Sequence, residues 1–177
     1  MITLRALRWP DDREHLLALD TSYTTERIYH VVAAEQSFVL EDTPTAPAFS
    51  KAYALADHLD YFPTYDHVVV AEIDTTFVGV AALNYESWNR RAVLWHLYVA
   101  AAYRGCGVGR ALIDDIVRAA RECRARCVWL ETQNTNYGAI QFYRRAGFQC
   151  CGLDLSLYDS EELVAGEIAL FFARQLV

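Results

Sequence analysis

Long hydrophobic runs are missing from this sequence, although hydrophobic residues make up 54% of its 177 residues. A membrane-spanning helix needs roughly 20 consecutive apolar residues, and no run of that length occurs, so we expect no membrane partner. The N-terminus alternates in polarity and includes Arg5 and Arg8, which is unlike a secretory signal peptide. Internal repeats and low-complexity segments are absent too. These features predict a single folded domain over residues 1–177 with a sizeable core.

No C-x-x-C pair occurs among the five cysteines, which are Cys106, Cys123, Cys127, Cys150 and Cys151. Their number is odd, so we predict reduced thiols, a cytoplasmic location and no metal site. The formal net charge is −7, which argues against a nucleic-acid partner and favours a cationic one. An ordinary acidic surface is the alternative explanation of that charge.

Hydrophobic patterning predicts a chain that mixes strands and helices. Apolar and alternating segments predict strands over residues 2–7, 67–73, 77–85, 92–99, 128–132, 148–157 and 166–172. An additional hairpin is predicted over 28–40, followed by a turn-rich connector over 43–47. Helices are predicted over 11–19, 51–59, 108–124 and 137–146. An apolar stripe on the third helix, which includes Leu112 and Ile116, predicts that this face is buried.

Three alternating glycines, Gly105, Gly107 and Gly109, lie between the 92–99 strand and the 108–124 helix. Without a Cβ atom, glycine lets backbone amides approach a ligand, and a helix N-terminus behind them favours phosphate. The spacing is not that of the dinucleotide fingerprint, and Arg110-Ala111 stands where a P-loop needs Lys-Ser/Thr. The loop therefore predicts another kind of phosphate site, with a purely structural turn as the alternative.

A second motif about thirty residues later changes this balance. It reads Asn136-x-x-Ala139-x-x-x-Tyr143-x-x-x-Gly147-Phe148, after the first motif Arg104-x-x-Gly107-x-Gly109. The two motifs, in this order and spacing, resemble the GNAT superfamily of acyl-CoA N-acyltransferases over residues 92–150. This resemblance implies an α+β fold. Its central sheet is mixed and mostly antiparallel, with six to seven strands, a splayed parallel pair and flanking helices.

Within the superfamily, two further segments resemble the streptothricin acetyltransferase group. They are Glu131-Thr132-Gln133-Asn134 and Cys151-Gly152-Leu153-Asp154-x-x-Leu157-Tyr158. This resemblance does not account for the 28–40 hairpin.

The resemblance also implies acetyl-CoA as a co-substrate. The pantetheine arm would bond the open strand edge of Leu97, Tyr98 and Val99. The backbone from Gly105 through Cys106, Gly107, Val108 and Gly109 to Arg110 would bind the pyrophosphate, with added charge from Arg104 and Arg110. Asn136, Ala139 and Tyr143 would contact the same molecule from the second motif. A helix-capping role for Asn136 and an ordinary surface role for the two arginines stay open.

Acetyl transfer to an amine needs a base, because a lysine-type amine has a pKa near roughly 10.4. It also needs an oxyanion donor, expected from a backbone N–H near Val99, and a proton for the leaving thiolate. The resemblance implies Tyr143 as the general acid, with a core aromatic as the alternative. Glu131, at the end of its strand, is one candidate base. His96 is the other, where many family members carry an acid; a structural histidine or a relayed water is equally open.

These residues predict an N-acetyltransferase that acts by direct attack in a ternary complex on a primary amine of a small molecule, such as a streptothricin-like antibiotic. A protein N-terminal or lysine acetyltransferase and a non-catalytic acyl-CoA-binding module are the alternatives. Acidic and aromatic residues in loops are candidates for an ammonium-binding cleft. They are Tyr85, Glu86, Trp88 and Asp154, with Tyr23 and Tyr158 as further candidates. We expect a monomer or homodimer with a small-molecule or peptide amine as substrate.

Overall fold

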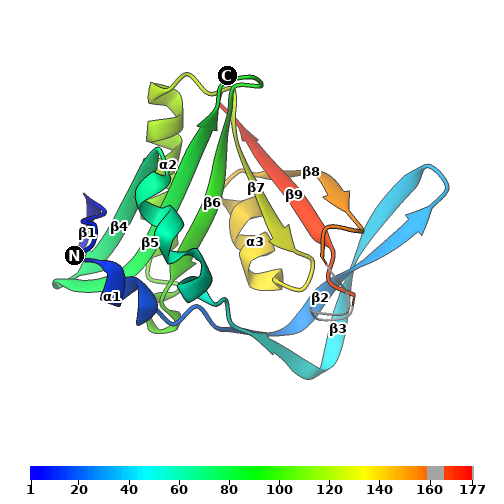
Figure 1. Cartoon of the computed structure of the whole chain (residues 1–177). Helices are drawn as coiled ribbons and strands as arrows, with labels where there is room; N and C mark the ends of the chain where they lie inside the picture. Colours follow the sequence, from blue (N-terminus) through cyan, green and yellow to red (C-terminus); the bar gives the residue numbers. More distant parts are fainter. Residues whose placement is uncertain (159–165, 177) are drawn as a thin grey trace. The chain divides into compact units, whose positions relative to one another are not determined.

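The computed structural model describes residues 1–158 and 166–176 (Figure 1). Its described residues form two compact units. The first comprises Met1–Ser22, Ala52–Trp129 and Gln175 onward, and the second comprises Tyr23–Lys51 and Leu130–Arg174. The single domain expected over residues 1–177 stays a prediction.

The first unit is built on an antiparallel sheet with the strand order β1-β4-β5-β6. Its elements are β1 (Ile2–Ala6), α1 (Arg13–Leu17), η1 (Leu55–Thr64), β4 (His67–Ile73), β5 (Thr76–Glu86), β6 (Arg91–Val99), η2 (Ala101–Tyr103) and α2 (Val108–Glu122). The start of β7 (Cys127–Gln133) pairs in parallel with the start of β6, joining Arg91–Val93 to Cys127–Trp129. β6 continues to Val99. That β6 and β7 splay apart beyond their three paired residues stays a prediction.

Helices cover both faces of this antiparallel sheet. On one face, the apolar stripe of α2 packs against β4 and β5, and both Leu112 and Ile116 are fully buried, as predicted. On the other face, α1 and η1 enclose a cluster in which Leu16 and Phe62 meet Val80. The burial of both faces explains why β4 and β5 carry nearly continuous apolar runs.

The second unit contains the rest of β7 and the strands β9 (Ala169–Gln175) and β8 (Gln149–Asp154), in the order β7-β9-β8. It also contains α3 (Tyr137–Arg145) and a separate two-stranded ribbon. The ribbon pairs β2 (Tyr23–Ala34) with β3 (Ser37–Lys51) (Figure 1). Together the two units hold seven strands of a mixed, mostly antiparallel sheet flanked by helices, which confirms the predicted fold class.

The ribbon is longer than the hairpin predicted over 28–40. The 43–47 segment, predicted as a connector, is part of β3, where Pro44 pairs with Arg27 next to a register shift. Proline is tolerated there because β3 is an edge strand and a bulge lies beside it. Lys51 ends β3 opposite Tyr23, so the helix predicted over 51–59 begins only at Leu55 and is a 3-10 helix.

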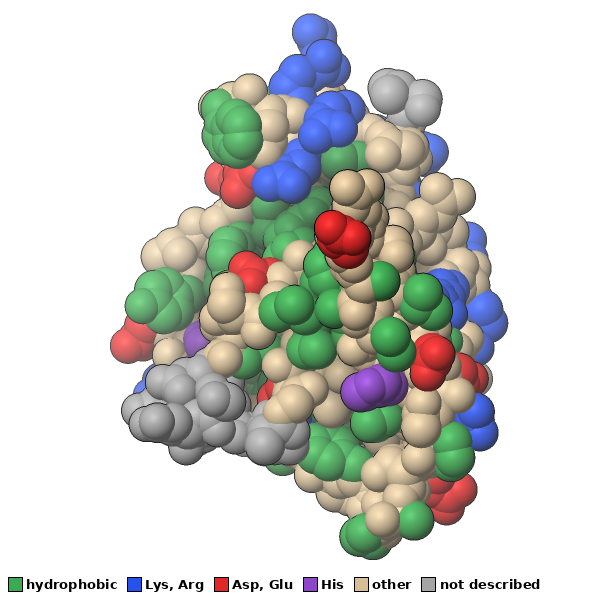
Figure 2. All heavy atoms as spheres, turned by 90° about the vertical axis from the view of Figure 1, so that its right-hand side faces the viewer, with side chains coloured by type: hydrophobic (Ala, Val, Ile, Leu, Met, Phe, Trp, Pro, Cys, Tyr) green, Lys and Arg blue, Asp and Glu red, His purple; other side chains and the backbone are tan. Residues whose placement is uncertain are grey.

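Apolar side chains are exposed toward the turn of this ribbon. Phe38 and Val39 each expose about half of their surface. Figure 2 shows one face of the molecule, on which Lys and Arg side chains gather at the top and along the right-hand edge, whereas hydrophobic side chains lie mostly in the middle with separate acidic ones beside them. Within the second unit, Tyr29 anchors the ribbon to α3, because its hydroxyl accepts hydrogen bonds from Gln141 at 2.8 Å and Arg144 at 2.6 Å.

Candidate active site

The glycine loop joins β6 to α2 in the first unit. Gly105 and Gly107 have φ angles of +79° and +89°, values that non-glycine residues rarely adopt. Gly107 is the N-cap of α2, whose first N–H groups have no intrahelical acceptor. A Cβ atom at Gly107 would meet only Ile2 Cδ1, at 3.8 Å, so conformation rather than space requires glycine here. The exposed loop and the fifteen-residue helix behind it form the geometry that binds phosphate oxygens.

The two predicted loop arginines already bond within the first unit. Arg104 donates from Nε to the Val99 carbonyl at 3.0 Å and from Nη1 to the Ser22 carbonyl at 2.5 Å. It therefore ties the loop to the end of β6. Arg110 is exposed and pairs with Asp114 one turn along α2, at 2.9 Å. Both arginines have a structural role in this state, and their contact with a pyrophosphate stays a prediction.

β6 carries a bulge before its end. Ala82 of β5 pairs with His96 and Leu83 with Leu94, so Trp95 is the additional residue. Bulges often re-aim side chains next to active sites. The strand edge predicted to bind pantetheine, Leu97 to Val99, follows directly and is half-buried.

His96 is buried and stacks on Phe62, with ring centroids 4.9 Å apart. Its Nε2 forms a 2.8 Å hydrogen bond with the Tyr65 hydroxyl, whereas Nδ1 has no hydrogen-bond partner among the described residues. Burial, helped by the nearby His58, lowers the pKa of His96 to about 4. Its imidazole is thus neutral and weakly basic at neutral pH.

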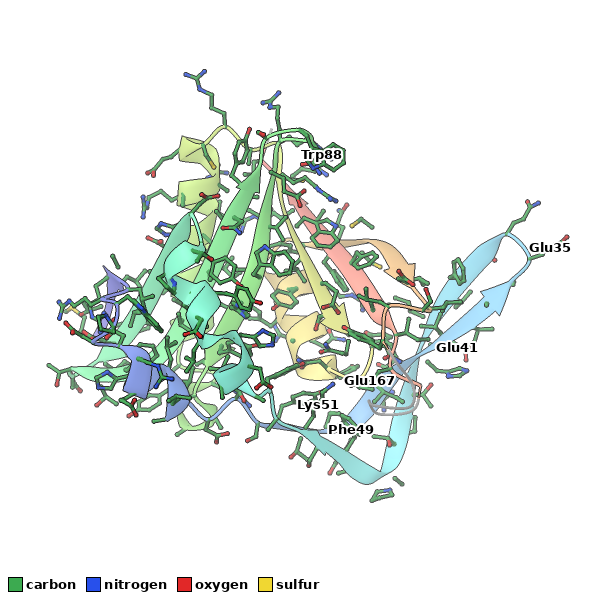
Figure 3. The ribbon with its side chains drawn as sticks, in the orientation of Figure 1. Glu35, Glu41, Phe49, Lys51, Trp88 and Glu167 are labelled. Atoms are coloured by element: carbon green, nitrogen blue, oxygen red, sulfur yellow. The ribbon has the colours of Figure 1, made fainter. Side chains whose placement is uncertain are left out.

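Three of the predicted substrate residues lie at the opposite end of the first unit's sheet from the glycine loop. Trp88 lies in the β5–β6 turn and is exposed (Figure 3), and Glu86 accepts a hydrogen bond from Asn89 in the same turn. β6 runs from this turn to Val99, a span of about 25 Å at the usual rise per residue. Tyr85, Glu86 and Trp88 therefore lie far from the glycine loop along β6, and their contact with a substrate stays a prediction.

Tyr85 instead lines an open hollow of about 530 Å³ between the start of β4 and the end of α2. The hollow is lined by Asp66, His67, Leu83, Tyr85, Ala119, Glu122 and Cys123. Because it lies at the end of α2 remote from the glycines, we do not assign it to the acyl donor.

The second predicted motif lies on α3, in the second unit. Asn136 is the N-cap of this helix, and its side chain accepts a hydrogen bond from the Ala139 amide at 3.2 Å. The capping interpretation of Asn136 is therefore confirmed, and its bond to pantetheine stays a prediction. Tyr143 is 8% exposed, with its ring against Phe148 and Phe172. Such packing fixes the ring and is compatible with either role predicted for Tyr143.

Glu131 lies near the end of β7 in the second unit and bonds Tyr158. The Tyr158 hydroxyl donates to Glu131 Oε1 and accepts from Gln133 Nε2, the latter at 2.8 Å. Burial raises the pKa of Glu131, against the opposing effects of the Tyr158 hydrogen bond and the Lys51 ammonium. A carboxylate with a raised pKa is a stronger base, as amine deprotonation requires.

A second carboxylate, Glu167, belongs to the same cluster. Its side chain is fully buried and accepts from Lys51 Nζ at 2.6 Å and from Thr135 Oγ1 at 2.8 Å. Figure 3 shows Lys51 and Glu167 pointing toward one another. Tyr23 adds a 3.2 Å hydrogen bond to Thr135. Tyr23 and Lys51, which pair across the base of the ribbon, thus contact Thr135, just after β7, and Glu167, just before β9.

Sequence reasoning found Glu131, Tyr23 and Tyr158 but missed Lys51, Thr135 and Glu167. Nothing in the local sequence around Lys51 or Glu167 signals that they meet, because 116 positions separate them. The predicted substrate residue Asp154 caps a local turn, accepting hydrogen bonds from the backbone and hydroxyl of Ser156.

Comparison with known proteins agrees with this geometry. The model of the acetyltransferase (GNAT) family matches residues 9–148. The chain belongs to this family. The GNAT chain is 35% identical to the streptothricin acetyltransferase of Streptomyces lavendulae over 171 residues, covering 93% of the chain and 90% of that protein. A streptothricin acetyltransferase from Escherichia coli is 28% identical over 163 residues and covers similar shares.

Solved structures show the same GNAT fold. The crystal structure of nourseothricin acetyltransferase superposes with a TM-score of 0.89 at 36% identity, covering 99% of each chain. A Bacillus anthracis acetyltransferase solved with acetyl coenzyme A superposes with a TM-score of 0.82 at 24% identity, over 99% of this chain and 100% of that one. The superfamily predicted from the two motifs is confirmed, and so is the resemblance to the streptothricin acetyltransferase group predicted from two further segments. The chain is an acyl-CoA-dependent N-acetyltransferase.

Proposed function

We propose that this enzyme acetylates a primary amine of a streptothricin-class antibiotic, by direct attack on acetyl-CoA in a ternary complex. The observation that carries the proposal is the half-buried Glu131–Tyr158 pair, in a chain 35% identical to a streptothricin acetyltransferase. The net charge of −7 also favours a cationic substrate of this kind.

Glu131 is the proposed base. An acceptor amine arrives mostly as an ammonium ion, because its pKa is near roughly 10.4. Glu131 would accept a proton from it, and burial favours that role by raising the pKa of the carboxyl. Tyr158 would hold the carboxylate in one orientation through its hydrogen bond. His96 is the alternative base, and its pKa of about 4 makes it the weaker of the two.

The glycine loop is the proposed seat of the acyl donor, which supplies the acetyl group as a thioester. Backbone amides from Gly105 to Arg110 would bind its pyrophosphate, supported by the positive end of α2. The edge of Leu97–Val99, together with Asn136 and Ala139, would bond the pantetheine amides. A backbone N–H near Val99 would stabilise the oxyanion, and Tyr143 would protonate the departing thiolate.

A thiol-release assay with acetyl-CoA tests the proposal directly. The amine panel contains streptothricin, polyamines, aminoglycosides, and peptides with free N-termini or lysines. We expect streptothricin to be the preferred acceptor, with mass spectrometry locating the acetyl group on an amine. Preference for peptides would replace this proposal with protein acetylation. Acetyl-CoA binding without release for any amine would instead indicate a non-catalytic module.

We further propose that the enzyme acts in the cytoplasm as a monomer or homodimer, without nucleic-acid or membrane partners. Among the helices that the structure describes, none has the length and apolar character to cross a membrane. Light scattering coupled to size-exclusion chromatography measures the oligomeric state.

A further inference from the structure

The two carboxylates of the second unit's cluster differ in how they are satisfied. Both oxygens of Glu167 are occupied, one by the Lys51 ammonium and the other by the Thr135 hydroxyl. A hydroxyl has a single hydrogen to donate. Since Thr135 gives its hydrogen to Glu167, Tyr23 is the donor in the Tyr23–Thr135 bond. Glu167 therefore has a partner from this chain on each oxygen, and its side chain is fully buried.

Glu131 is only half satisfied by comparison. Tyr158 donates to its Oε1, and Oε2 has no hydrogen-bond partner in the described part of the chain. Amines need a carboxylate oxygen that is open to them. In this cluster, Glu131 offers one and Glu167 does not.

Lys51 causes this difference between Glu167 and Glu131. It is the one lysine in the sequence, against fifteen arginines. Its ammonium is the same chemical group as a protonated primary amine, so it competes for the same carboxylates as the acceptor. Lys51 stands opposite Tyr23 at the base of the β2–β3 ribbon, and its side chain is only 18% exposed. The β2–β3 ribbon, which the sequence alone did not explain, thus places the Lys51 ammonium in the cluster with Glu131 and Glu167.

We propose that Lys51 is a positioning residue for acetyl transfer: by occupying Glu167, it leaves Glu131 as the carboxylate that receives the acceptor ammonium. With both carboxylates ionised, Glu131, Glu167 and Lys51 carry a net charge of −1, from two negative charges and one positive. That balance accommodates one further ammonium, on Glu131. The inference rests on the proposed role of Glu131 as the base.

A purely structural role for the Lys51–Glu167 pair is the competing explanation, since the pair also ties the end of β3 to the residues before β9. The two explanations differ in what happens to Glu131. Among the residues that the structure describes, the titratable groups that act on Glu131 are Tyr158, Lys51 and Glu167. Beyond the dominant effect of burial, Lys51 lowers the pKa of Glu131 and Glu167 raises it. Removing either charge shifts the titration of Glu131 under both explanations, so the apparent KM for the amine decides between them: only a positioning role lets a released Lys51 ammonium compete with the amine for Glu131.

The test compares the pH dependence of kcat/KM for Lys51→Met, Glu167→Gln and the double variant. If Lys51 acts on Glu131, the acid limb of kcat/KM moves to higher pH in Lys51→Met, because the positive charge that stabilises the ionised Glu131 carboxylate is removed. In Glu167→Gln it moves to lower pH. The released Lys51 ammonium then competes for Glu131. If it occupies Glu131 for nine-tenths of the time, the apparent KM for the amine rises about tenfold.

The double variant lacks the competing ammonium, so its KM should return toward the parental value. Arg27→Met is the matched control, because it removes an exposed ion pair with Asp42 in the same ribbon and should move neither limb nor KM. Acid limbs that coincide with the parent in both single variants, or a KM in the double variant as high as in Glu167→Gln, would overturn the proposal. Where a single variant fails to fold, the other and the double variant still decide.

All measurements use the best acceptor found in the amine panel. If the wild-type enzyme prefers another amine, the streptothricin proposal is refuted, whereas the proposed positioning role of Lys51 is unaffected. The Glu131→Gln variant tests the base assignment separately. If the acid limb of the pH profile survives in Glu131→Gln, the base assignment fails. If the limb is lost there but does not respond to the Lys51 and Glu167 variants, the Lys51 assignment fails.

Discussion

Replacing Gly107 tests whether the glycine loop binds the acyl donor in the conformation seen here. At a φ of +89°, a residue with a Cβ atom is strained by about 1–2 kcal/mol. Contact adds little, because the nearest atom to a Cβ would be Ile2 Cδ1 at 3.8 Å. A substituted loop should relax to another conformation in the free enzyme and must regain the observed one to bind.

That strain converts directly into affinity. Since about 1.4 kcal/mol corresponds to a tenfold change, Gly107→Ala should weaken acetyl-CoA binding by about 5- to 30-fold. Gly107→Val should weaken it further, because a β-branched residue tolerates this region less. Isothermal titration calorimetry with acetyl-CoA measures both dissociation constants.

Gly147→Ala is the matched control for strain alone. Gly147 has a similar φ of +87° but follows α3 and lies outside the glycine loop. It should lower stability to a similar extent without changing the dissociation constant. Parental affinity in both Gly107 variants would refute the assignment of the loop as the acyl-donor site.

Further predictions concern the core and the acid–base groups. Leu112→Ala or Ile116→Ala should lower the free energy of unfolding by about 2–5 kcal/mol in urea melts, because both side chains are fully buried; unchanged midpoints would refute this. Tyr143→Phe should lower kcat by about 10²–10⁴ with near-parental acetyl-CoA affinity, and a parental kcat would end the acid assignment. Glu131→Gln should abolish the acid limb of the pH–rate profile, whereas His96→Gln should preserve it; the reverse result would make His96 the base.

His96 should also make the free energy of unfolding depend on pH. The pKa of His96 is lowered to about 4, so the unfolded chain takes up a proton first as the pH falls. Stability is fully present above the unfolded value of about 6.5 and is lost between there and pH 4, by roughly 3 kcal/mol. Denaturant melts across this range measure the slope. His96→Gln should remove it, and an unchanged slope in that variant would contradict the burial argument.

The local features of the glycine loop and of α2 could be predicted because each depends on residues close in sequence. The alternating glycines, the N-cap at Gly107 and the apolar stripe through Leu112 and Ile116 all lie within about one helix length. Their spacing encodes both the positive φ angles and the buried face. The same holds for Asn136, which caps the helix that immediately follows it.

The ribbon was predicted too short for a physical reason. Strand pairing depends on the partner strand more than on intrinsic propensity. The prolines of β3, which usually mark a connector, are tolerated because a bulge and an open edge remove the need for their amides. The predicted substrate residues Tyr85, Glu86 and Trp88 illustrate another limit, because composition alone does not indicate at which end of a strand such residues lie, and their contact with a substrate stays a prediction.

The cluster of Lys51, Glu131 and Glu167 could not be predicted from local sequence patterns, because its members are far apart in the sequence. Its members come from the end of a ribbon, the end of a central strand and the residues before the last strand. Each alone is an ordinary charged residue. Only the fold gives one carboxylate a partner on each oxygen and the other a partner on a single oxygen. An enzyme that must bind an ammonium and then deprotonate it needs such asymmetry, since two equally open carboxylates would hold the charged form of the amine more tightly and oppose its deprotonation.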